Sequence, residues 1–221
     1  MFTNQENTIS NLNPGADDLW FLPLGGTGEI GMNLNLYGHQ GKWLMVDCGV
    51  SFNEPLVPTT KAPDSALADT FAVVAPDPTF IAENKDALAG LVITHGHEDH
   101  VGAVPYLWKR FRCPVYTTPF TAELLRRKLA RENLGGQIPI IEVSGESTHT
   151  IGPFVVSWLA ITHSIPEPYA VKIATQRAPD CIPPTGKLML ILLAGKRLST
   201  VCINRLPRKI FLPWWAIQPM H

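Results

Sequence analysis

A short apolar run that ends in a cluster of histidines and carboxylates is the strongest constraint in this sequence. Residues Leu88–Thr94 read as a buried strand because they are mostly apolar and a turn follows them. The next six residues, His95 to His100, hold three histidines and two carboxylates. Imidazole nitrogens and carboxylate oxygens bind zinc at about 2.0–2.2 Å. The sequence therefore predicts a zinc site at the end of this strand.

The residues of this cluster divide into two sets. Alternation places His95 and His97 on one side of the turning backbone, whereas Asp99 and His100 reach a second position. Gly96 leaves room for the backbone to fold around an ion. A single histidine is more often a surface or core residue than a ligand, but the full pattern after a buried strand favours metal ligation.

Two other strand ends carry candidate residues. His163 ends an apolar strand and is predicted to complete a three-histidine site, although alone it would be a weak signal. Asp47 follows the strand Trp43–Val46. Its ordinary role would be a turn or cap carboxylate, and its functional interpretation is an acceptor that orients a metal-bound histidine.

The rest of the chain predicts a layered α/β sandwich. With 221 residues, 45% hydrophobic and 17% charged, it suffices for one well-cored domain. We expect residues 51–78 to form a surface excursion and the four cysteines to be reduced and mostly buried. Further strands are predicted at Trp20–Leu24, Asn33–Tyr37, Cys113–Tyr116, Val155–Thr162 and Ala170–Ala174, and helices around Val101–Phe111 and Ala122–Arg131.

The sequence also favours a soluble, cytoplasmic protein that does not enter a membrane. Its polar start lacks the basic and apolar regions of a signal peptide. The longest purely apolar run, Leu188–Ala194, is far short of the roughly 20 residues that span a bilayer. No pattern indicates an oligomeric state, so a homo-oligomer stays open.

Several motifs together resemble a known family. His-x-His-x-Asp-His, with Val-Asp-Cys-Gly upstream and His163 downstream, is similar to the metallo-β-lactamase superfamily. Three stretches narrow the resemblance to ribonuclease J, a β-CASP-type RNA-processing enzyme, over residues 18–175. They are Leu24–Asn33, with its sequence Leu-Gly-Gly-Thr-Gly-Glu-Ile-Gly-Met-Asn, Thr94–Leu107 and Thr162–Glu167.

This resemblance implies an αββα sandwich, of which the chain holds the N-terminal portion. It also implies a two-zinc phosphodiesterase that acts on RNA as a 5′-to-3′ exonuclease and as an endonuclease. His95, His97 and His163 would hold one zinc, and Asp99 and His100 would help to hold the other. Asp99 is the candidate catalytic residue that positions the attacking hydroxide.

A glycine-rich loop precedes the second predicted strand. Its backbone N–H groups are candidates to lie near the site, although such a loop is equally a tight turn. The glycines concerned are Gly25, Gly26, Gly28 and Gly31.

Two other functions remain open. The first is hydrolysis of a small ester, thioester or lactone on the same fold, and the second is a non-catalytic fragment that binds metal. Residues 176–221 hold seven of the 18 basic residues and one of the 19 acidic ones, which leaves residues 1–175 with a net charge of −7. The expectation of RNA as a partner therefore rests on the resemblance and not on composition.

The family pattern breaks after Thr175. The family continues with segments like His-Thr-Gly-Asp-Trp-Lys and Asp-Ser-Thr-Asn, which this chain lacks. Reading the codons one base back permits His-Thr-Ala-Asp-Trp-Lys at Cys181–Lys187 and Asp-Ser-Thr-Asn within Pro213–His221. We therefore hypothesise a one-base frameshift between Thr175 and Gln176.

The frameshift hypothesis sets the expected domain organisation. Residues 1–17 would be a flexible arm, 18–175 an incomplete metallo-β-lactamase domain, and 176–221 an out-of-frame tail that is disordered or poorly packed. Such a chain would hold one zinc or none and would show weak or absent nuclease activity.

Sequencing the gene across the codons for Thr175 and Gln176 tests this hypothesis. We expect an additional C, which would restore the frame and extend the protein with the missing family motifs. A frame identical to the one given would contradict the hypothesis and favour the non-catalytic interpretation.

Overall fold

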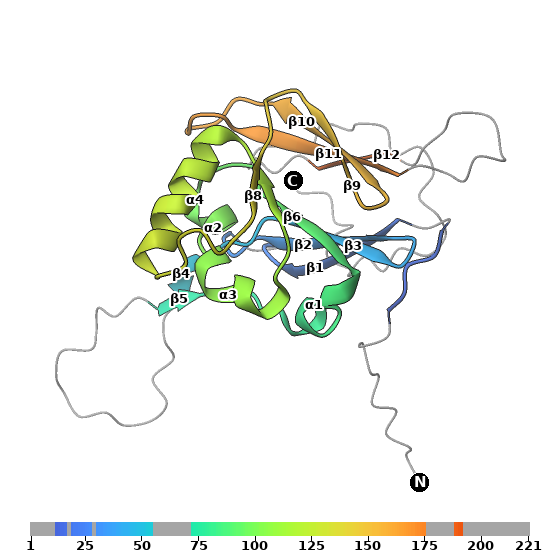
Figure 1. Ribbon diagram of the computed structural model, residues 1–221, viewed down its shortest axis with the longest axis horizontal. Helices are drawn as coiled ribbons and strands as arrows, with labels where there is room; N and C mark the ends of the chain where they lie inside the picture. Colours follow the sequence, from blue (N-terminus) through green and yellow to red (C-terminus); the bar gives the residue numbers. More distant parts are fainter. Residues whose placement is uncertain (1–11, 17–18, 28–29, 55–71, 176–187, 192–221) are drawn as a thin grey trace, which may run out of the picture.

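The structure, a computed structural model, describes residues 12–16, 19–27, 30–54, 72–175 and 188–191, which form two main sheets and a helical layer (Figure 1). The six-stranded sheet has the order β1-β2-β3-β6-β7-β8, and the four-stranded sheet the order β12-β11-β10-β9. The strands of the six-stranded sheet are β1 (Trp20–Gly25), β2 (Leu34–His39), β3 (Lys42–Val46), β6 (Leu88–Val92), β7 (Val115–Thr117) and β8 (Ile140–Glu142). The strands of the four-stranded sheet are β12 (Leu188–Ile191), β11 (Tyr169–Thr175), β10 (Phe154–Ala160) and β9 (Thr148–Ile151).

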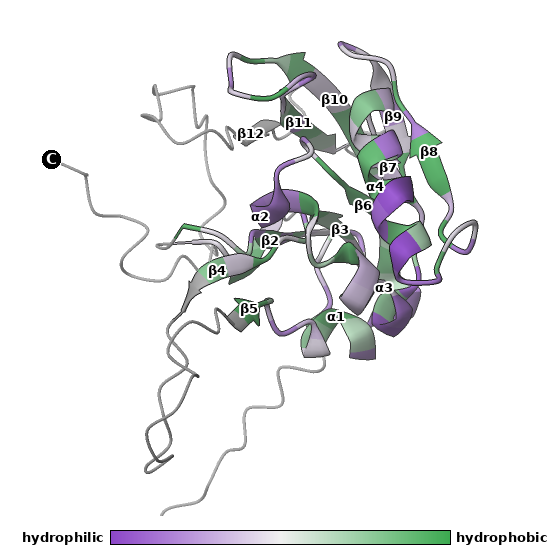
Figure 2. Cartoon of the chain, turned by 90° about the vertical axis from the view of Figure 1, so that its left-hand side faces the viewer, coloured by the Kyte–Doolittle hydropathy of each residue, from purple (hydrophilic) through white to green (hydrophobic). Residues whose placement is uncertain are grey.

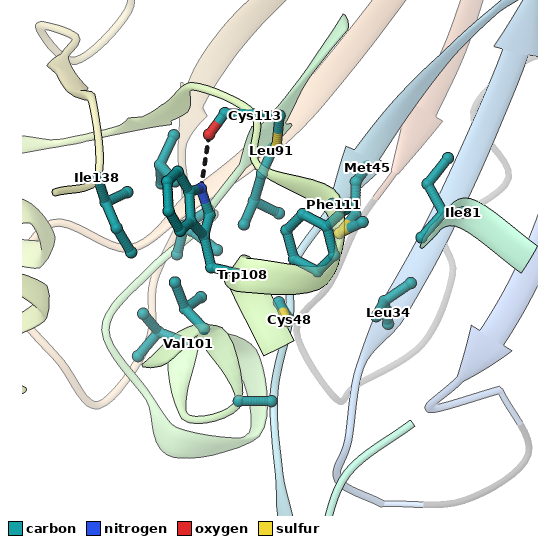
Figure 3. Packing of buried hydrophobic residues seen from close by; sticks show 14 of the residues in the cluster. Leu34, Met45, Cys48, Ile81, Leu91, Val101, Trp108, Phe111, Cys113 and Ile138 are labelled. Atoms are coloured by element: carbon teal, nitrogen blue, oxygen red, sulfur yellow. Dashed lines mark hydrogen bonds between the residues drawn. The ribbon is translucent and has the colours of Figure 1, made fainter. Parts of the chain in front are cut away.

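The helices pack on one face of the six-stranded sheet. They are α1 (Thr79–Glu83), α2 (Glu98–Val101), α3 (Val104–Phe111) and α4 (Pro119–Arg131), with the short 3-10 helix η2 (Lys85–Ala87). Figure 3 shows part of this core, in which Trp108 and Phe111 of α3 lie near Leu91 of β6. The indole N–H of Trp108 donates to the carbonyl oxygen of Cys113 at 2.7 Å. This bond ties α3 to the start of the next strand.

A second core fills the space between the two sheets. Phe154 and Trp158 of β10 are fully buried there and belong to one cluster with Leu44 of β3 and Val92 of β6. The helix layer, the six-stranded sheet and the four-stranded sheet thus form three successive layers. The α/β sandwich predicted from the sequence is confirmed. Among the described residues, no helix covers the outer face of the four-stranded sheet (Figure 1).

Parallel strands bring the candidate residues to one edge. β3, β6, β7 and β8 run parallel to one another, so their carboxyl ends meet at the same side of the sheet. Asp47 follows β3, the histidine cluster follows β6, and α4 begins after β7. Ligand sites of open α/β sheets form outside the carboxyl ends of such strands.

The structure corrects some of the predicted elements. Within residues 51–78, β4 (Ser51–Glu54) and β5 (Ala72–Val74) pair as a two-stranded antiparallel sheet, and residues 55–71 lie outside the described residues. The helix predicted around Val101–Phe111 is two helices, since Pro105 lies in the first turn of α3 and starts a new helix there. The short strands β8 and β9 had no signal in the sequence.

The ends of the chain are described in part. Of the predicted arm, the carbonyl groups of Pro14 and Gly15 accept hydrogen bonds from Gly41 and Gln40 at 2.8 and 3.1 Å. Of the predicted out-of-frame tail, only Leu188–Ile191 is described, as the edge strand β12 beside β11. The other residues of 176–221 lie outside the described residues, so the frameshift stays a prediction.

Two of the four cysteines are described, and both are buried free thiols. Burial raises the pKa of Cys113 to about 12 and also raises that of Cys48. They are therefore unreactive core residues, as expected; Cys181 and Cys202 lie outside the described residues. Within the described residues, no helix is long and apolar enough to cross a membrane.

The inter-sheet core makes a testable prediction about stability. Trp158 is fully buried, whereas its neighbour Leu159 points to the opposite face and is 38% exposed. Trp158→Ala should lower the free energy of unfolding by about 3–5 kcal/mol, and Leu159→Ala by only about 0.5 kcal/mol. Urea denaturation measures both, and equal losses would show that the two sheets do not enclose a common core.

Candidate metal centre

The segment after β6, residues 93–100, is the metal loop, and its residues 98–100 already belong to α2. Thr94 and His95 are fully buried. A Cβ added at Gly96 would lie 2.7 Å from Cδ1 of Leu124, so the loop packs closely against α4. This contact gives Gly96 a packing role beside the room around an ion expected from the sequence. Figure 2 shows the hydrophilic α2 next to the hydrophobic β6 at this position.

Three histidines, which follow strands of both sheets, lie close together at the metal loop. His95 and His97 come from the metal loop, and His163 comes from the connection between β10 and β11. Their ligand atoms all lie within 4.8 Å of one another, and His95 Nε2 is 3.1 Å from His97 Nδ1. Ligands of a tetrahedral zinc ion lie roughly 3.4 Å apart. The three imidazoles thus form a group that can hold a metal ion.

A buried carboxylate lies behind these rings. Asp47 is fully buried, and its Oδ2 is 2.7 Å from Nδ1 of His100. Its Oδ1 accepts the backbone N–H of Thr94 at 2.9 Å, and the Thr94 hydroxyl lies 2.9 Å from Nδ1 of His95. Asp47 has φ of 61°, a left-handed conformation that aspartate tolerates better than most residues. It thus contacts His100 directly and His95 through Thr94.

The two sets of histidines differ in charge. Burial, followed by the charges of His100, His97 and His163, lowers the pKa of His95 to about 3, and burial also lowers the pKa of His97. These imidazoles are neutral at pH 7 and keep a lone pair for a metal. Burial alone would lower the pKa of His100, but the Asp47 charge and hydrogen bonds to Asp47 and Asp99 outweigh it and raise the pKa to about 10. His100 is therefore protonated at pH 7 in the absence of a metal, and a metal that bound its Nε2 would have to displace that proton.

Asp99 and His100 form the second predicted set. Nε2 of His100 lies 3.3 Å from Oδ2 of Asp99. Burial would raise the pKa of Asp99, but the hydrogen bond and charge of His100 lower it, so this carboxylate is ionised at neutral pH. The His95 and His100 rings are 4.1 Å apart between centroids, so the two sets adjoin.

Sequence reasoning missed Asn33 at this site. Its Nδ2 donates to the Asp99 carbonyl oxygen at 3.0 Å and lies 3.4 Å from both Asp99 Oδ2 and His100 Nε2. Its backbone N–H donates to the same carbonyl at 3.0 Å. The available signal was its place at the end of the glycine-rich stretch, which says nothing of a contact 66 residues away.

The glycine-rich loop reaches the site through Asn33. Gly26 has φ of 80°, and a Cβ added there would lie 2.3 Å from Asn33 Oδ1. Gly31 has φ of 110°, and its added Cβ would lie 2.9 Å from Ser51. Gly25 would meet the Met32 carbonyl at 2.4 Å, and Gly28 lies outside the described residues. These glycines allow tight turns and close packing, and a role of their N–H groups in binding stays a prediction.

One basic residue of α4 has a specific partner near the site. The Lys128 ammonium pairs with the carboxylate of Glu98, which lies between His97 and Asp99 in the metal loop. Arg126 and Arg127 of the same helix pair with exposed carboxylates, those of Glu142 and Glu123. Lys128 differs because it joins α4 to α2.

Comparison with known families agrees with this geometry. Residues 31–181 match the model of the metallo-beta-lactamase superfamily, a segment that includes every candidate ligand. The chain belongs to the metallo-β-lactamase superfamily. The fold class predicted from the sequence is thereby confirmed.

Curated relatives narrow the similarity. The chain is 44% identical over 164 residues to ribonuclease J of Sinorhizobium meliloti, which covers 72% of this chain and 27% of that protein. It is 32% identical over 181 residues to ribonuclease J 1 of Streptococcus pyogenes, which covers 82% of this chain and 29% of that protein. The resemblance to ribonuclease J is confirmed, and the chain spans less than a third of these relatives.

Solved structures give a more distant likeness. A structure described as Rm3 metallo-beta-lactamase aligns with a TM-score of 0.48 at 15% sequence identity, and the alignment covers 82% of this chain and 64% of that one.

The Asp47 network makes a prediction about metal affinity. Asp47→Ala removes the acceptor that orients His100 and Thr94, and we expect zinc affinity to fall by about 10–100-fold. Competition with a chromophoric chelator measures this affinity. Asp86→Ala, at an exposed aspartate of η2, is the matched control and should bind zinc as the parent does. Equal affinity of the two variants would contradict the role of Asp47.

Proposed function

We propose that this chain carries the metal centre of a zinc-dependent ribonuclease of the ribonuclease J type, which hydrolyses phosphodiester bonds during RNA processing and decay. The observation that carries the proposal is the three-histidine cluster, which adjoins Asp99 and His100. Support for RNA as the substrate class comes from the two ribonuclease J relatives, because the superfamily match alone names no RNA substrate.

Each residue has a defined part in this proposal. His95, His97 and His163 hold one zinc ion, and Asp99 and His100 help to hold a second. When bound, zinc activates water for attack on phosphorus and stabilises charge on the phosphate. The ionised Asp99 carboxylate accepts a hydrogen bond from the attacking water and so orients it.

The scaffold keeps these side chains in place before a metal arrives. Asp47 accepts from Nδ1 of His100 and so turns Nε2 toward Asp99. Thr94 holds His95 from behind in the same way. Such outer contacts fix the ring orientation that a metal requires.

Cleavage mode and location follow the family resemblance. We propose 5′-to-3′ exonuclease and endonuclease activity in the cytoplasm. The 221-residue chain itself should be impaired, because the described residues offer the second zinc only Asp99 and His100. Metal binding without turnover is therefore the second candidate, favoured by this incomplete second set.

Zinc counting combined with RNA cleavage tests the proposal. Purified protein should hold one zinc per chain by elemental analysis, and His163→Ala should lose most of it because one of three imidazoles is gone. Single-stranded RNA labelled at either end should be cleaved slowly, and EDTA should abolish the cleavage. His149→Ala, at a histidine of β9 outside the centre, is the matched control.

The outcomes separate the candidates. One zinc with no cleavage favours the metal-binding fragment, and cleavage of a thioester but not RNA favours a small-substrate hydrolase. A chain that holds no zinc, or that holds it equally well as His163→Ala, would contradict the proposed centre.

A further inference from the structure

The third histidine of the centre depends on a loop from the other sheet. His163 lies in residues 161–168, between β10 and β11, and is exposed. The Ile161 N–H donates to the Pro168 carbonyl at 3.2 Å and closes the base of this loop. His95 and His97, in contrast, follow β6 of the six-stranded sheet. A contact between the two parts must therefore hold residues 161–168 in place relative to the metal loop.

Glu167 supplies such a contact. Its Oε2 accepts the backbone N–H of Phe120 at 2.9 Å, in a partly buried hydrogen bond between residues 47 positions apart. Phe120 lies in the first turn of α4, whose N–H groups have no partner within the helix. The beginning of α4 lies beside the loop between β10 and β11 (Figure 1). A carboxylate is favoured at such a helix end because the helix dipole is positive there.

The local cap of this helix is not used. Thr118 stands at the N-cap, where threonine commonly accepts a backbone N–H, but it makes no such hydrogen bond. Its Oγ1 and that of Thr121 are buried and have no hydrogen-bond partner in the described part of the chain. A first-turn N–H of α4 is therefore satisfied from the other sheet and not by its own N-cap.

Phe120, the residue that Glu167 contacts, belongs to the same sheet-and-helix layers that carry His95 and His97. α4 follows β7, which pairs with β6. Leu124 of α4 and Ile165 of the loop both lie next to Gly96, where an added Cβ would be 2.7 and 3.5 Å from their Cδ1 atoms. Gly96 separates His95 from His97. A loop held at Phe120 is therefore held relative to both metal-loop histidines.

The backbone of Glu167 points to the same conclusion. Its φ of 51° is in the left-handed region, which a glutamate seldom adopts. Such conformations persist where the surrounding structure determines them and are concentrated near functional sites. Pro166 and Pro168 on either side further restrict the backbone.

We propose that Glu167 is a positioning residue that caps α4 and thereby sets His163 against His95 and His97. The inference rests on the proposed metal centre but not on RNA as its substrate. It predicts that the effect of Glu167 on zinc binding is exerted through His163 alone.

A double-mutant cycle on zinc affinity tests this inference. Affinity is measured by chelator competition for the full chain, Glu167→Ala, His163→Ala and the double variant. Glu167→Ala should weaken zinc binding on the order of tenfold. In the His163→Ala background it should cause no further loss, because the ligand that it positions is already gone. Glu142→Ala, at a glutamate that also contacts α4 through Arg126, is the matched control and should bind as the parent does.

A second variant and a spectroscopic signal exclude a merely structural effect. Glu167→Gln keeps an acceptor oxygen for Phe120 and should fall between the parent and Glu167→Ala. With cobalt in place of zinc, Glu167→Ala should change the visible absorption bands that report coordination geometry, while the Glu142→Ala spectrum stays that of the parent.

Three results would overturn the inference. The first is a Glu167→Ala variant that binds zinc as tightly as the parent. The second is an equal loss of zinc affinity when Glu167→Ala is made in the parent and in the His163→Ala variant, which would mean a general loss of stability. The third is a parent chain whose zinc affinity does not depend on His163. That result removes the proposed centre itself and is recognised before any Glu167 variant is compared.

Discussion

The buried carboxylate of Asp47 is the interaction on which the arrangement of the metal loop depends. It lies fully enclosed at the end of β3 and accepts hydrogen bonds from Thr94 and His100, both of which follow β6. Removing one partner of such a buried pair typically costs about 3–5 kcal/mol. The carboxylate thus links two neighbouring strand ends and orients His100, and through Thr94 it also reaches His95.

The centre combines a locally determined half with a half that depends on the packing of two sheets. His95, His97, Asp99 and His100 share one short loop, so a single strand end places them all. His163 arrives from the four-stranded sheet, and its distance from the others depends on the inter-sheet core around Trp158 and on the contact of Glu167 with α4. The geometry of the three-histidine cluster and the packing between the sheets are therefore coupled.

The sequence predicted the candidates of the local half, because a strand followed by a ligand pattern is visible within about a dozen residues. Asp47 and His163 were also predicted as candidates, since Asp47 directly follows β3 and His163 lies three residues after β10. Asn33 and Glu167 were not assigned roles, because their partners are 66 and 47 residues away. Lys128 was not assigned a role either, and only the position of α2 beside α4 reveals its pair with Glu98. Contacts of this kind depend on how elements pack, which periodicity does not encode.

X-ray absorption at the zinc edge tests the central claim most directly, namely that one zinc ion is held by histidines from both sheets. For the zinc-loaded chain, the account predicts a first shell of nitrogen or oxygen at about 2.0–2.1 Å, with the outer-shell scattering of three imidazoles. His163→Ala should reduce that signal to two imidazoles. A shell with sulfur at about 2.3 Å, or one without imidazole scattering, would contradict the account.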